Sequence, residues 1–402
     1  MKRVLFIIET LRGGGAERAL SNIVMHFPDD WCVDILINDK SLVEYPYKGN
    51  LISLYAPEKK SAIYFTRNII KRIFLLRKLK LENGYEACVS FLDSASISNV
   101  LSGNKHCKTI VSIRNNMMSN KTGLVEKIGT ILLIKLLYIH ADKIISVSKE
   151  IETILVNKLK ISENKVQTIV NGYDSKWIRE KMRIIPANKI LSLGRDRSKL
   201  NVVVTVGRLV DQKGQWHLIR AFSEVIKKEP QTVLVIIGEG ILKEYLRKLI
   251  ESCSLEGKVF LAGYSENPFW YNALADTFVL PSLYEGYPNA LAEAVCCGTP
   301  CIATDVHSGV REILAPDLNV MGKRVVNISE EEYGVLIPVC SGRKYGDGEY
   351  LETEEQMMAE AIIEMLSNNK KREYYRKKSL ERSFDLDINS VLDKWIGIIS
   401  EK

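Results

Sequence analysis

The sequence predicts an α/β protein built from two doubly wound, parallel-sheet domains. Short apolar runs typical of buried strands alternate with segments of helical periodicity along nearly the whole chain, a pattern that favours parallel sheets. The chain also has 402 residues, which exceeds the length at which a single hydrophobic core stops growing. Two successive Rossmann-like domains are therefore the simplest architecture.

The first series of elements extends to residue 170. Strands are expected at 3–8, 31–37, 51–55, 88–91, 109–113, 143–147 and 166–170. Helices are expected at 16–27, 63–81, 94–101, 124–140 and 149–157. The turn residues Asn171-Gly172-Tyr173-Asp174 follow, so we assign residues 1–174 to the first domain.

A second series follows residues 175–200, a charged segment without clear periodicity that we predict to connect the domains. Strands are expected at 202–206, 232–237, 259–261, 277–280, 301–303 and 334–337. Helices are expected at 214–228, 242–252, 289–297, 355–366, 370–384 and 389–399. This places a second domain at 201–384 and a C-terminal helix at 385–402 that can cross back to the first domain.

Composition favours a soluble, cytoplasmic protein. Hydrophobic and charged contents of 46% and 26% are ordinary for a globular chain. The eight cysteines are scattered in apolar runs and indicate reduced, buried thiols. Cys296, Cys297 and Cys301 lie close in sequence but lack a fourth ligand, so we predict no metal site. The longest apolar run, 131–139, is too short to span a membrane.

The net charge of +7 is concentrated in the first half of the chain. The expected helix at 63–81 interleaves large apolar residues with six cations, which are Arg67, Lys71, Arg72, Arg77, Lys78 and Lys80. This pattern fits peripheral contact with an anionic membrane surface. It fits equally well a core-packed helix with a solvated basic face. We predict no nucleic-acid partner, because no binding motif accompanies the charge.

The stretch 281–304 carries the strongest chemical signal, since it is typical of a strand, a tight loop, a helix and a second strand. Glu285 precedes the expected helix, and Glu293 lies in its second turn. The backbone N–H groups at the helix start can hold an anion or a sugar hydroxyl; they belong to Gly286, Tyr287, Asn289 and Ala290. The alternative is a solvated loop glutamate and an ordinary amphipathic-helix glutamate.

Two further loops follow strands in the same way. Arg208 and Lys213 stand between a strand and a helix, where a guanidinium and an ammonium suit a diphosphate. Pairing of Arg208 with Asp211 is the alternative. Gly13-Gly14-Gly15 also lies between a strand and a helix, and lets the backbone approach a ligand. Its spacing matches neither the dinucleotide fingerprint nor the Walker loop.

Together these motifs resemble family 4 of the retaining, nucleotide-sugar-dependent glycosyltransferases, which have the GT-B fold of two Rossmann-like domains facing across a cleft. The segments that carry the resemblance are Gly13-Gly-Gly-Ala-Glu-Arg18, Val206-Gly-Arg208 with Lys213-Gly214, Phe260-Leu-Ala-Gly-Tyr264, the Glu285/Glu293 pair and Gly298-Thr-Pro300.

The resemblance implies a role for each of these residues. Arg208 and Lys213 would bind the donor diphosphate and stabilise the leaving group, while Glu285 would hold the donor sugar as the third catalytic residue. Glu293 would take the ribose hydroxyls. Gly263, Tyr264 and Asn267 would lie by the base, Gly286, Tyr287, Pro288, Asn289 and Ala290 by the sugar and phosphate, and Gly14 and Gly15 by the acceptor and donor phosphate.

The implied chemistry needs neither a cofactor nor a metal, because fixed cations and a helix N-terminus can stabilise the departing diphosphate. No apolar strand leads into an Asp-x-Asp pair. Retention would follow from same-face attack by the acceptor, and a covalent intermediate on Glu285 is the less favoured alternative. Many relatives carry a histidine after the strand at 109–113; here Arg114 and Asn115 stand there, and we expect one of them to contact the sugar or acceptor.

The segment Glu285-Gly-Tyr-Pro-Asn289-Ala is similar to that of bacterial enzymes that build surface polysaccharides such as capsule or O-antigen. We therefore predict transfer of a hexose or N-acetylhexosamine from a UDP-linked donor. The acceptor would be a glycan or a polyprenyl-diphosphate-linked sugar at the inner face of the membrane. A nucleotide-sugar epimerase and a non-catalytic sugar- or nucleotide-binding module are the rival hypotheses.

Overall fold

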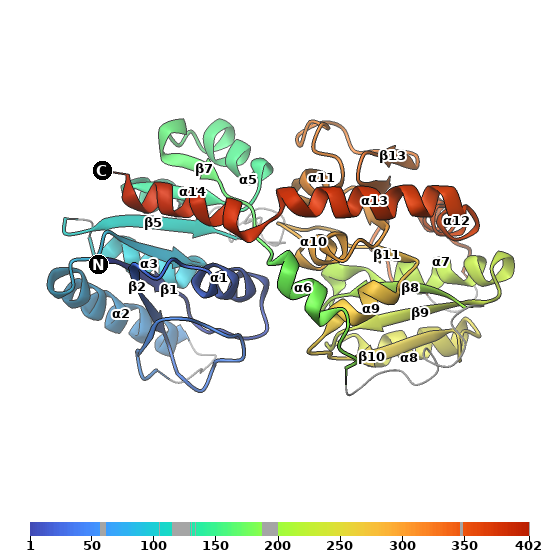
Figure 1. Ribbon diagram of the computed structural model, residues 1–402, viewed down its shortest axis with the longest axis horizontal. Coiled ribbons are helices and arrows are strands. Elements are labelled where there is room, and N and C mark those ends of the chain that lie inside the picture. Colours follow the sequence, from blue (N-terminus) through green and yellow to red (C-terminus); the bar gives the residue numbers. More distant parts are fainter. Residues whose placement is uncertain are drawn as a thin grey trace. The chain divides into compact units, whose positions relative to one another are not determined.

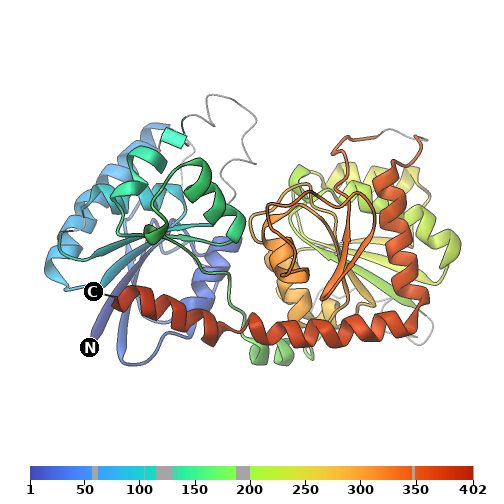
Figure 2. The ribbon, with the colours of Figure 1, turned by 90° about the horizontal axis from the view of Figure 1, so that it is seen from above.

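The computed structural model, drawn in Figures 1 and 2, describes residues 1–56, 62–103, 105–114, 129, 131–132, 134–186, 200–345 and 349–401. It divides into two compact units. Unit 1 comprises Met1–Gly172 and Asp387–Lys402, and unit 2 comprises Tyr173–Leu386. The C-terminal helix thus belongs to the same unit as the N-terminus.

Unit 1 is a seven-stranded parallel sheet with helices on both faces. Its strand order is β3-β2-β1-β4-β5-β6-β7. The strands are β1 (Lys2–Ile7), β2 (Trp31–Ile37), β3 (Asn50–Ser53), β4 (Ala87–Phe91), β5 (Lys108–Ile113), β6 (Lys143–Ser146) and β7 (Val166–Thr168). The helices are α1 (Gly15–Met25), α2 (Ala62–Glu82), α3 (Asp93–Leu101), α5 (Lys149–Thr153) and α14 (Ile388–Ser400), with short turns at Tyr138–His140, Ile154–Lys158 and Glu163–Lys165.

Helix α14 completes the core of unit 1. Its apolar side chains pack with those of β1, β2 and β4 in one buried cluster. Trp395 stacks on Phe91 with ring centroids 6.0 Å apart. The start of α14 also lies so close to residue 172 that only glycine fits there, since a Cβ would meet the backbone of Ile388 at 2.9 Å. Unit 1 therefore depends on a segment more than two hundred residues away from the rest of its chain.

Two of the cations predicted to decorate the basic helix point inward. Arg72 of α2 is fully buried and donates to Asn38 Oδ1 at 2.7 Å and Ser94 Oγ at 2.9 Å. Lys80 is buried too, and its ammonium donates to the Gly103 carbonyl at 2.6 Å. The interpretation of all six cations as one exposed charged face was therefore wrong for these two. Long polar side chains can extend from the helix into the interior of the unit.

Unit 2 is a second seven-stranded sheet, in the order β10-β9-β8-β11-β12-β14-β13, in which only the β13–β14 pair is antiparallel. The strands are β8 (Asn201–Val206), β9 (Thr232–Ile237), β10 (Val259–Gly263), β11 (Thr277–Leu280), β12 (Cys301–Thr304), β13 (Ser329–Glu331) and β14 (Gly334–Ile337). The helices are α6 (Ser175–Lys181), α7 (Gln215–Lys228), α8 (Lys243–Ser252), α9 (Pro268–Leu274), α10 (Asn289–Cys296), α11 (Ser308–Leu314), α12 (Thr353–Ser367) and α13 (Asn369–Asp385), with a 3₁₀ turn at Asp211–Lys213.

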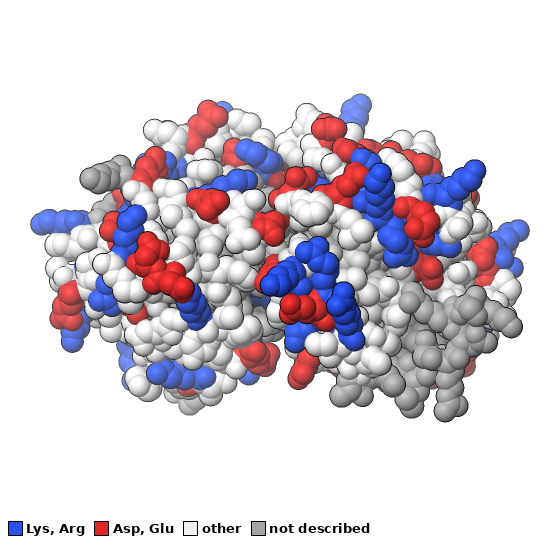
Figure 3. Space-filling model, viewed as in Figure 1, with Lys and Arg blue, Asp and Glu red and all other residues white. Residues whose placement is uncertain are grey.

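Four of these elements were not predicted: α6, α9, α11 and β13. Each is short, so too few apolar positions repeat to reveal a period. Helix α6 begins inside the segment 175–200, which we expected to be a connection, because the Asp174 carboxylate caps it by accepting from the Trp177 N–H. Lys and Arg side chains gather over α6 in Figure 3, where Lys176, Arg179 and Arg183 are exposed. Residues 187–199 lie outside the described part of the chain.

The other predicted elements are present with ends shifted by a few residues. The helix expected at 149–157 is an exception, because α5 ends at Thr153 and continues as a π-helical turn over Ile154–Lys158. Of the helix expected at 124–140, residues 129, 131–132 and 134–136 are helical and 138–140 form a 3₁₀ turn, whereas 124–128, 130 and 133 lie outside the described residues. None of the described helices is long and apolar enough to cross a membrane.

A pair of glycine substitutions tests the close backbone approach between the loops after β8 and β9. Gly238 has φ +144, and a Cβ there would overlap the carbonyl oxygen of Gly207. Gly238→Ala should therefore destabilise unit 2 by about 3 kcal/mol. Urea unfolding followed by circular dichroism measures this loss.

Gly397→Ala is the matched control, because nothing lies within 4 Å of a Cβ at this position of α14. Alanine has the higher helix propensity, so this variant should be about 0.5–1 kcal/mol more stable. Equal stability of Gly238→Ala and the wild type would contradict the close approach.

Candidate active site

The candidate site of unit 2 lies where β8, β9, β10 and β11 end, at the carboxyl edge of the sheet. The loops after these strands are joined through their backbones: the Gly207 N–H donates to the Ile237 carbonyl at 2.9 Å, and the Gly238 N–H donates to the Gly263 carbonyl at 2.8 Å. Parallel α/β sheets bind ligands at this edge. The glycines after the strands are therefore needed for close backbone packing.

Lys213 and Glu285, which the sequence separates by 72 residues, form the central contact of this edge. The ammonium of Lys213 lies 2.5 Å from Glu285 Oε1. The same oxygen accepts a hydrogen bond from Ser282 Oγ at 2.7 Å, and Oε2 accepts one from Gln212 Nε2 at 3.2 Å. Three donors thus hold a carboxylate whose side chain is only 5% exposed. The structure brings together two residues that were predicted to act on different parts of one ligand.

Backbone bonds hold the two loops in register around this pair. The Leu283 N–H donates to the Gln212 carbonyl at 2.9 Å, and Gln212 Nε2 donates to the Tyr284 carbonyl at 3.0 Å. Gly214 has φ +59, and a Cβ there would collide with the Pro281 carbonyl. Glycine is thus required where α7 passes the loop after β11.

Arg208 is exposed beside this pair, and within the described ranges no side chain forms an ion pair or hydrogen bond with its guanidinium. The predicted alternative of pairing with Asp211 is wrong, because Asp211 Oδ1 lies 2.5 Å from Lys344 Nζ. Burial raises the pKa of the nearby Tyr284 phenol, and the charges of Asp211 and Glu285 add to this shift. The charge of Arg208 opposes it, so the guanidinium lies near the same ring.

The start of α10 forms the next part of the edge. Asn289 is the first residue of α10, and its Oδ1 accepts from the Tyr173 hydroxyl at 2.5 Å. The Tyr287 side chain is buried against Gly309, and burial raises the pKa of its phenol. Only the backbone of Tyr287 can therefore meet a ligand. Glu293 is buried in the second turn of α10.

Two of the three residues predicted to lie by the base differ in exposure. Tyr264 is 61% exposed after β10. Asn267 is 8% exposed, and its amide nitrogen donates to the carbonyls of Lys181 and Ile184 at 2.8 and 2.6 Å. The Asn267 amide nitrogen thus anchors the end of α6, and its place by the base stays a prediction.

The predicted residues of unit 1 occupy two loops of their own sheet. Gly14 is the N-cap of α1, which begins at Gly15. The Glu17 carboxylate folds back over Gly14, so it brings negative charge to the positive end of α1. A donor phosphate would therefore require Glu17 to move away.

Arg114 lies at the end of β5, where the parallel strands of unit 1 end. It is 6% exposed, lies 4.6 Å from the Phe91 ring centre and donates to Asn171 Oδ1 at 2.7 Å. These contacts hold its side chain in place, and its contact with sugar or acceptor stays a prediction. Asn115 lies outside the described residues.

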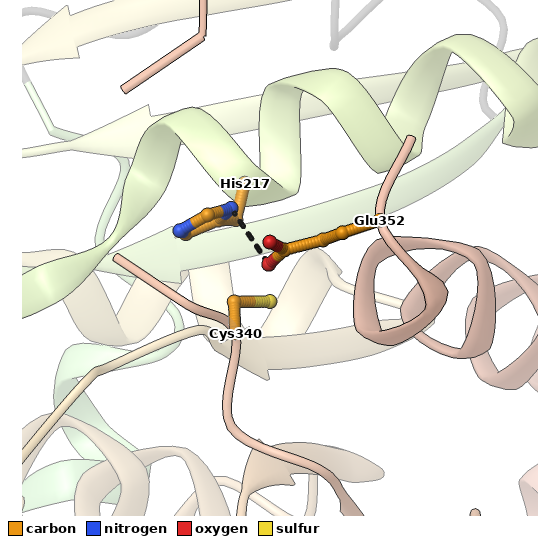
Figure 4. A group of neighbouring side chains, drawn as sticks. All are labelled: His217, Cys340 and Glu352. Atoms are coloured by element: carbon orange, nitrogen blue, oxygen red, sulfur yellow. Dashed lines mark ion pairs between the residues drawn. The ribbon is translucent and has the colours of Figure 1, made fainter. Parts of the chain in front are cut away.

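A cluster that sequence reasoning missed lies next to the loop after β11. Figure 4 shows His217 of α7, Cys340 after β14 and Glu352 before α12 pointing toward one another. His217 Nδ1 lies 2.8 Å from Glu355 Oε1 and 3.4 Å from Glu352 Oε1. Its Nε2 accepts from the Gly342 N–H at 3.2 Å. These bonds satisfy a neutral imidazole that carries its proton on Nδ1.

The electrostatics of the cluster agree with this hydrogen-bonded arrangement. Burial alone would raise the pKa of Glu352, but hydrogen bonds from Ser341 and Tyr345 outweigh it and lower the pKa. Burial raises the pKa of the Cys340 thiol. The cluster thus anchors residues 341–345 beside Leu283, which a Cβ at Gly342 would meet at 2.9 Å. No motif signals it, because its members come from three distant segments.

Comparisons with known proteins agree with this geometry. Residues 194–324 match the family model described as glycosyl transferases group 1. An N-acetylgalactosamine-N,N'-diacetylbacillosaminyl-diphospho-undecaprenol 4-alpha-N-acetylgalactosaminyltransferase of Campylobacter jejuni is 29% identical over 403 residues, 96% of either chain.

Solved structures show the same fold. HepE of Anabaena, in complex with UDP and glucose, matches with a TM-score of 0.74 at 17% identity. The match covers 100% of both chains. Sucrose-phosphate synthase of Thermosynechococcus elongatus has a TM-score of 0.76 at 17% identity, with 99% of this chain and 98% of that chain covered. The predicted GT-B fold class is thus confirmed.

The relative that decides the family is an uncharacterized glycosyltransferase of Methanocaldococcus jannaschii. It is 32% identical to this chain over 357 residues, and the match covers 86% of both proteins. The chain therefore belongs to the glycosyltransferases, and its residues 194–324 match the group 1 model.

Proposed function

We propose that this glycosyltransferase moves a hexose or N-acetylhexosamine from a UDP-linked donor to a glycan or lipid-linked acceptor in surface polysaccharide synthesis. The observation that carries the proposal is the Lys213–Glu285 contact beside the exposed Arg208. It joins a carboxylate suited to sugar hydroxyls with two cations suited to a diphosphate. The UDP bound to HepE and the diphospho-undecaprenol named for the C. jejuni relative support the same donor and acceptor classes.

The two cations would stabilise the departing diphosphate. Lys213 has three N–H donors and gives one of them to Glu285, so two remain for phosphate oxygens. Arg208 adds a planar fork, and the first N–H groups of α10 add the positive end of a helix dipole. Charge that develops on the leaving group thus meets donors already in place, without a metal. Glu293 would hold the ribose hydroxyls.

We further propose retention by same-face attack of the acceptor hydroxyl. The Glu285 carboxylate is held by Lys213, Gln212 and Ser282, so its nucleophilicity is reduced and it is a poor candidate for a covalent intermediate. Its role would be to orient the sugar. Proton NMR of the first product formed reports the anomeric configuration, and an inverted product would contradict this mechanism.

Arg208→Ala tests the proposed leaving-group role. The variant should lose about 10²–10³-fold in kcat, because one preorganised contact to the developing charge is removed. The measurement is release of UDP from a panel of UDP-hexoses and UDP-N-acetylhexosamines, with and without a lipid-linked acceptor. Addition of EDTA should leave the wild-type rate unchanged.

Arg247→Ala is the control, because Arg247 is an exposed arginine of the same unit that pairs only with Glu244 and Glu251 of its own helix. It should keep wild-type activity. Donor binding without turnover would favour the rival binding module. Interconversion of the sugars without transfer would favour an epimerase.

The outer face of α2 supports peripheral contact with an anionic membrane. Three large apolar side chains are exposed there, at Ile70, Phe74 and Leu81, with fractions of 49%, 65% and 61%. Four cations share this face, at Arg67, Lys71, Arg77 and Lys78, whereas Glu82 is the only acidic residue of α2. Apolar insertion and attraction to anionic lipid would therefore act together.

Phe74→Asp should weaken binding to anionic vesicles at least about tenfold, because it removes apolar area and adds a repelled charge. Sedimentation with phosphatidylglycerol vesicles at low salt measures the bound fraction. Phe384→Asp is the matched control, since Phe384 is 71% exposed in unit 2. Equal binding by both variants would rule out the outer face of α2 as the contact, and no binding by the wild type would argue for a soluble acceptor.

A further inference from the structure

Two thiols of unit 1 lie in direct contact at the amino edge of its sheet. Cys88 belongs to β4, and Cys107 immediately precedes β5. Their sulfur atoms are 3.3 Å apart and share a hydrogen bond. Cys88 is fully buried, whereas Cys107 is 8% exposed. The pair lies at the opposite end of β4 and β5 from the loops where such sheets bind ligands.

A buried ammonium accompanies the two thiols. Lys80 reaches them from α2 and donates to three neutral oxygens: the carbonyls of Asn99 and Gly103 and the hydroxyl of Thr109. No carboxylate among the described residues lies within ion-pair distance of its Nζ. A buried cation whose bonded partners are all neutral favours negative charge on a nearby group. The groups whose negative charge acts on this ammonium are the thiols of Cys88 and Cys107 and, more weakly, the carboxylate of Asp142.

The two thiols respond differently to this environment. The hydrogen bond with Cys88 lowers the pKa of Cys107, and the Lys80 charge adds to this shift against the effect of burial. Burial raises the pKa of Cys88. Cys107 is therefore the better nucleophile of the pair, and Cys88 is the thiol that keeps its proton.

Cys107 is also the member that a small reagent can reach. It lines an open cavity of about 520 Å³, together with Lys105, His106, Lys108, Asp142, Lys143 and Glu401. The charge of Asp142 raises the pKa of Cys107, whereas that of Lys80 lowers it. Three other thiols differ, since burial raises the pKa of Cys297, Cys301 and Cys340.

We propose that Cys107 is a site of reversible oxidation by hydroperoxides, with Cys88 as its resolving thiol. The Cys107 thiolate attacks a peroxide oxygen, the O–O bond breaks, and hydroxide leaves as the sulfur becomes a sulfenic acid. The Cys88 sulfur then attacks the Cys107 sulfur, an S–S bond forms, and the S–O bond breaks. The departing hydroxide takes the Cys88 proton and leaves as water, so two thiols have passed two electrons to one peroxide.

The cross-link would close the loop from Cys88 to Cys107, which contains most of β4 and all of α3. A cross-link restricts the unfolded chain, so unit 1 should become more resistant to unfolding. Arg208, Lys213 and Glu285 belong to unit 2, so turnover should change little. The proposal thus stands independently of the proposed donor and acceptor.

Hydrogen peroxide is the probe for this site. After mild treatment of the whole protein, mass spectrometry of a non-reduced digest should find the Cys88–Cys107 peptide pair, which dithiothreitol should separate again. The melting temperature of the oxidised protein should rise by several degrees. Oxidation of Cys32 or Cys253 without the Cys88–Cys107 link would overturn the proposal.

Two variants separate the roles of the two thiols. Cys88→Ser should leave a sulfenic acid on Cys107 that dimedone labels, because the resolving thiol is absent. Cys107→Ser should abolish both label and link. Cys253→Ser is the matched control and should form the link as the wild type does. Dimedone labelling of Cys88 in Cys107→Ser at the rate of Cys107 in Cys88→Ser would contradict the assigned nucleophile.

Discussion

The contact between Lys213 and Glu285 is the interaction on which the candidate site depends. It exists because β8 and β11 are neighbours in a parallel sheet, so the loops after them emerge at the same edge. Gln212 and Ser282 hold the carboxylate from either side, while a glycine at 214 lets α7 pass the loop after β11. A buried, strongly held ion pair keeps a cation in place before any ligand arrives. The site is thus preorganised by the topology of the sheet.

The residues around this contact hold its two loops in place. The His217 cluster anchors residues 341–345 against Leu283. Lys344 forms an ion pair with Asp211, so Asp211 does not pair with Arg208, which is exposed. The start of α10 is held by the Tyr173 hydroxyl on Asn289. Such rigidity suits the function proposed above, because fixed charges that need no rearrangement stabilise developing charge most effectively.

Four polar side chains are more buried than their positions indicate. Arg72, Lys80, Arg114 and Asn267 lie beside strand ends or on an amphipathic helix, where exposure is the ordinary expectation. Each instead turns inward: Arg72 donates to Ser94, Lys80 to Gly103, Arg114 to Asn171 and Asn267 to Ile184. These partners come from distant segments, so no local pattern reveals them.

The sequence by itself determined the fold class and the residue types of the candidate site, because alternating periodicities and loop motifs are local properties of the chain. This local information sufficed to predict most helices and strands. It also sufficed to predict the positions of Glu285 and Glu293 and the cations at 208 and 213. Only the tertiary structure decided which of these groups touch. The Lys213–Glu285 ion pair, the burial of Arg114, the His217 cluster and the paired thiols of Cys88 and Cys107 all join segments whose proximity results from long-range strand order and packing, which leave no trace in short stretches of sequence.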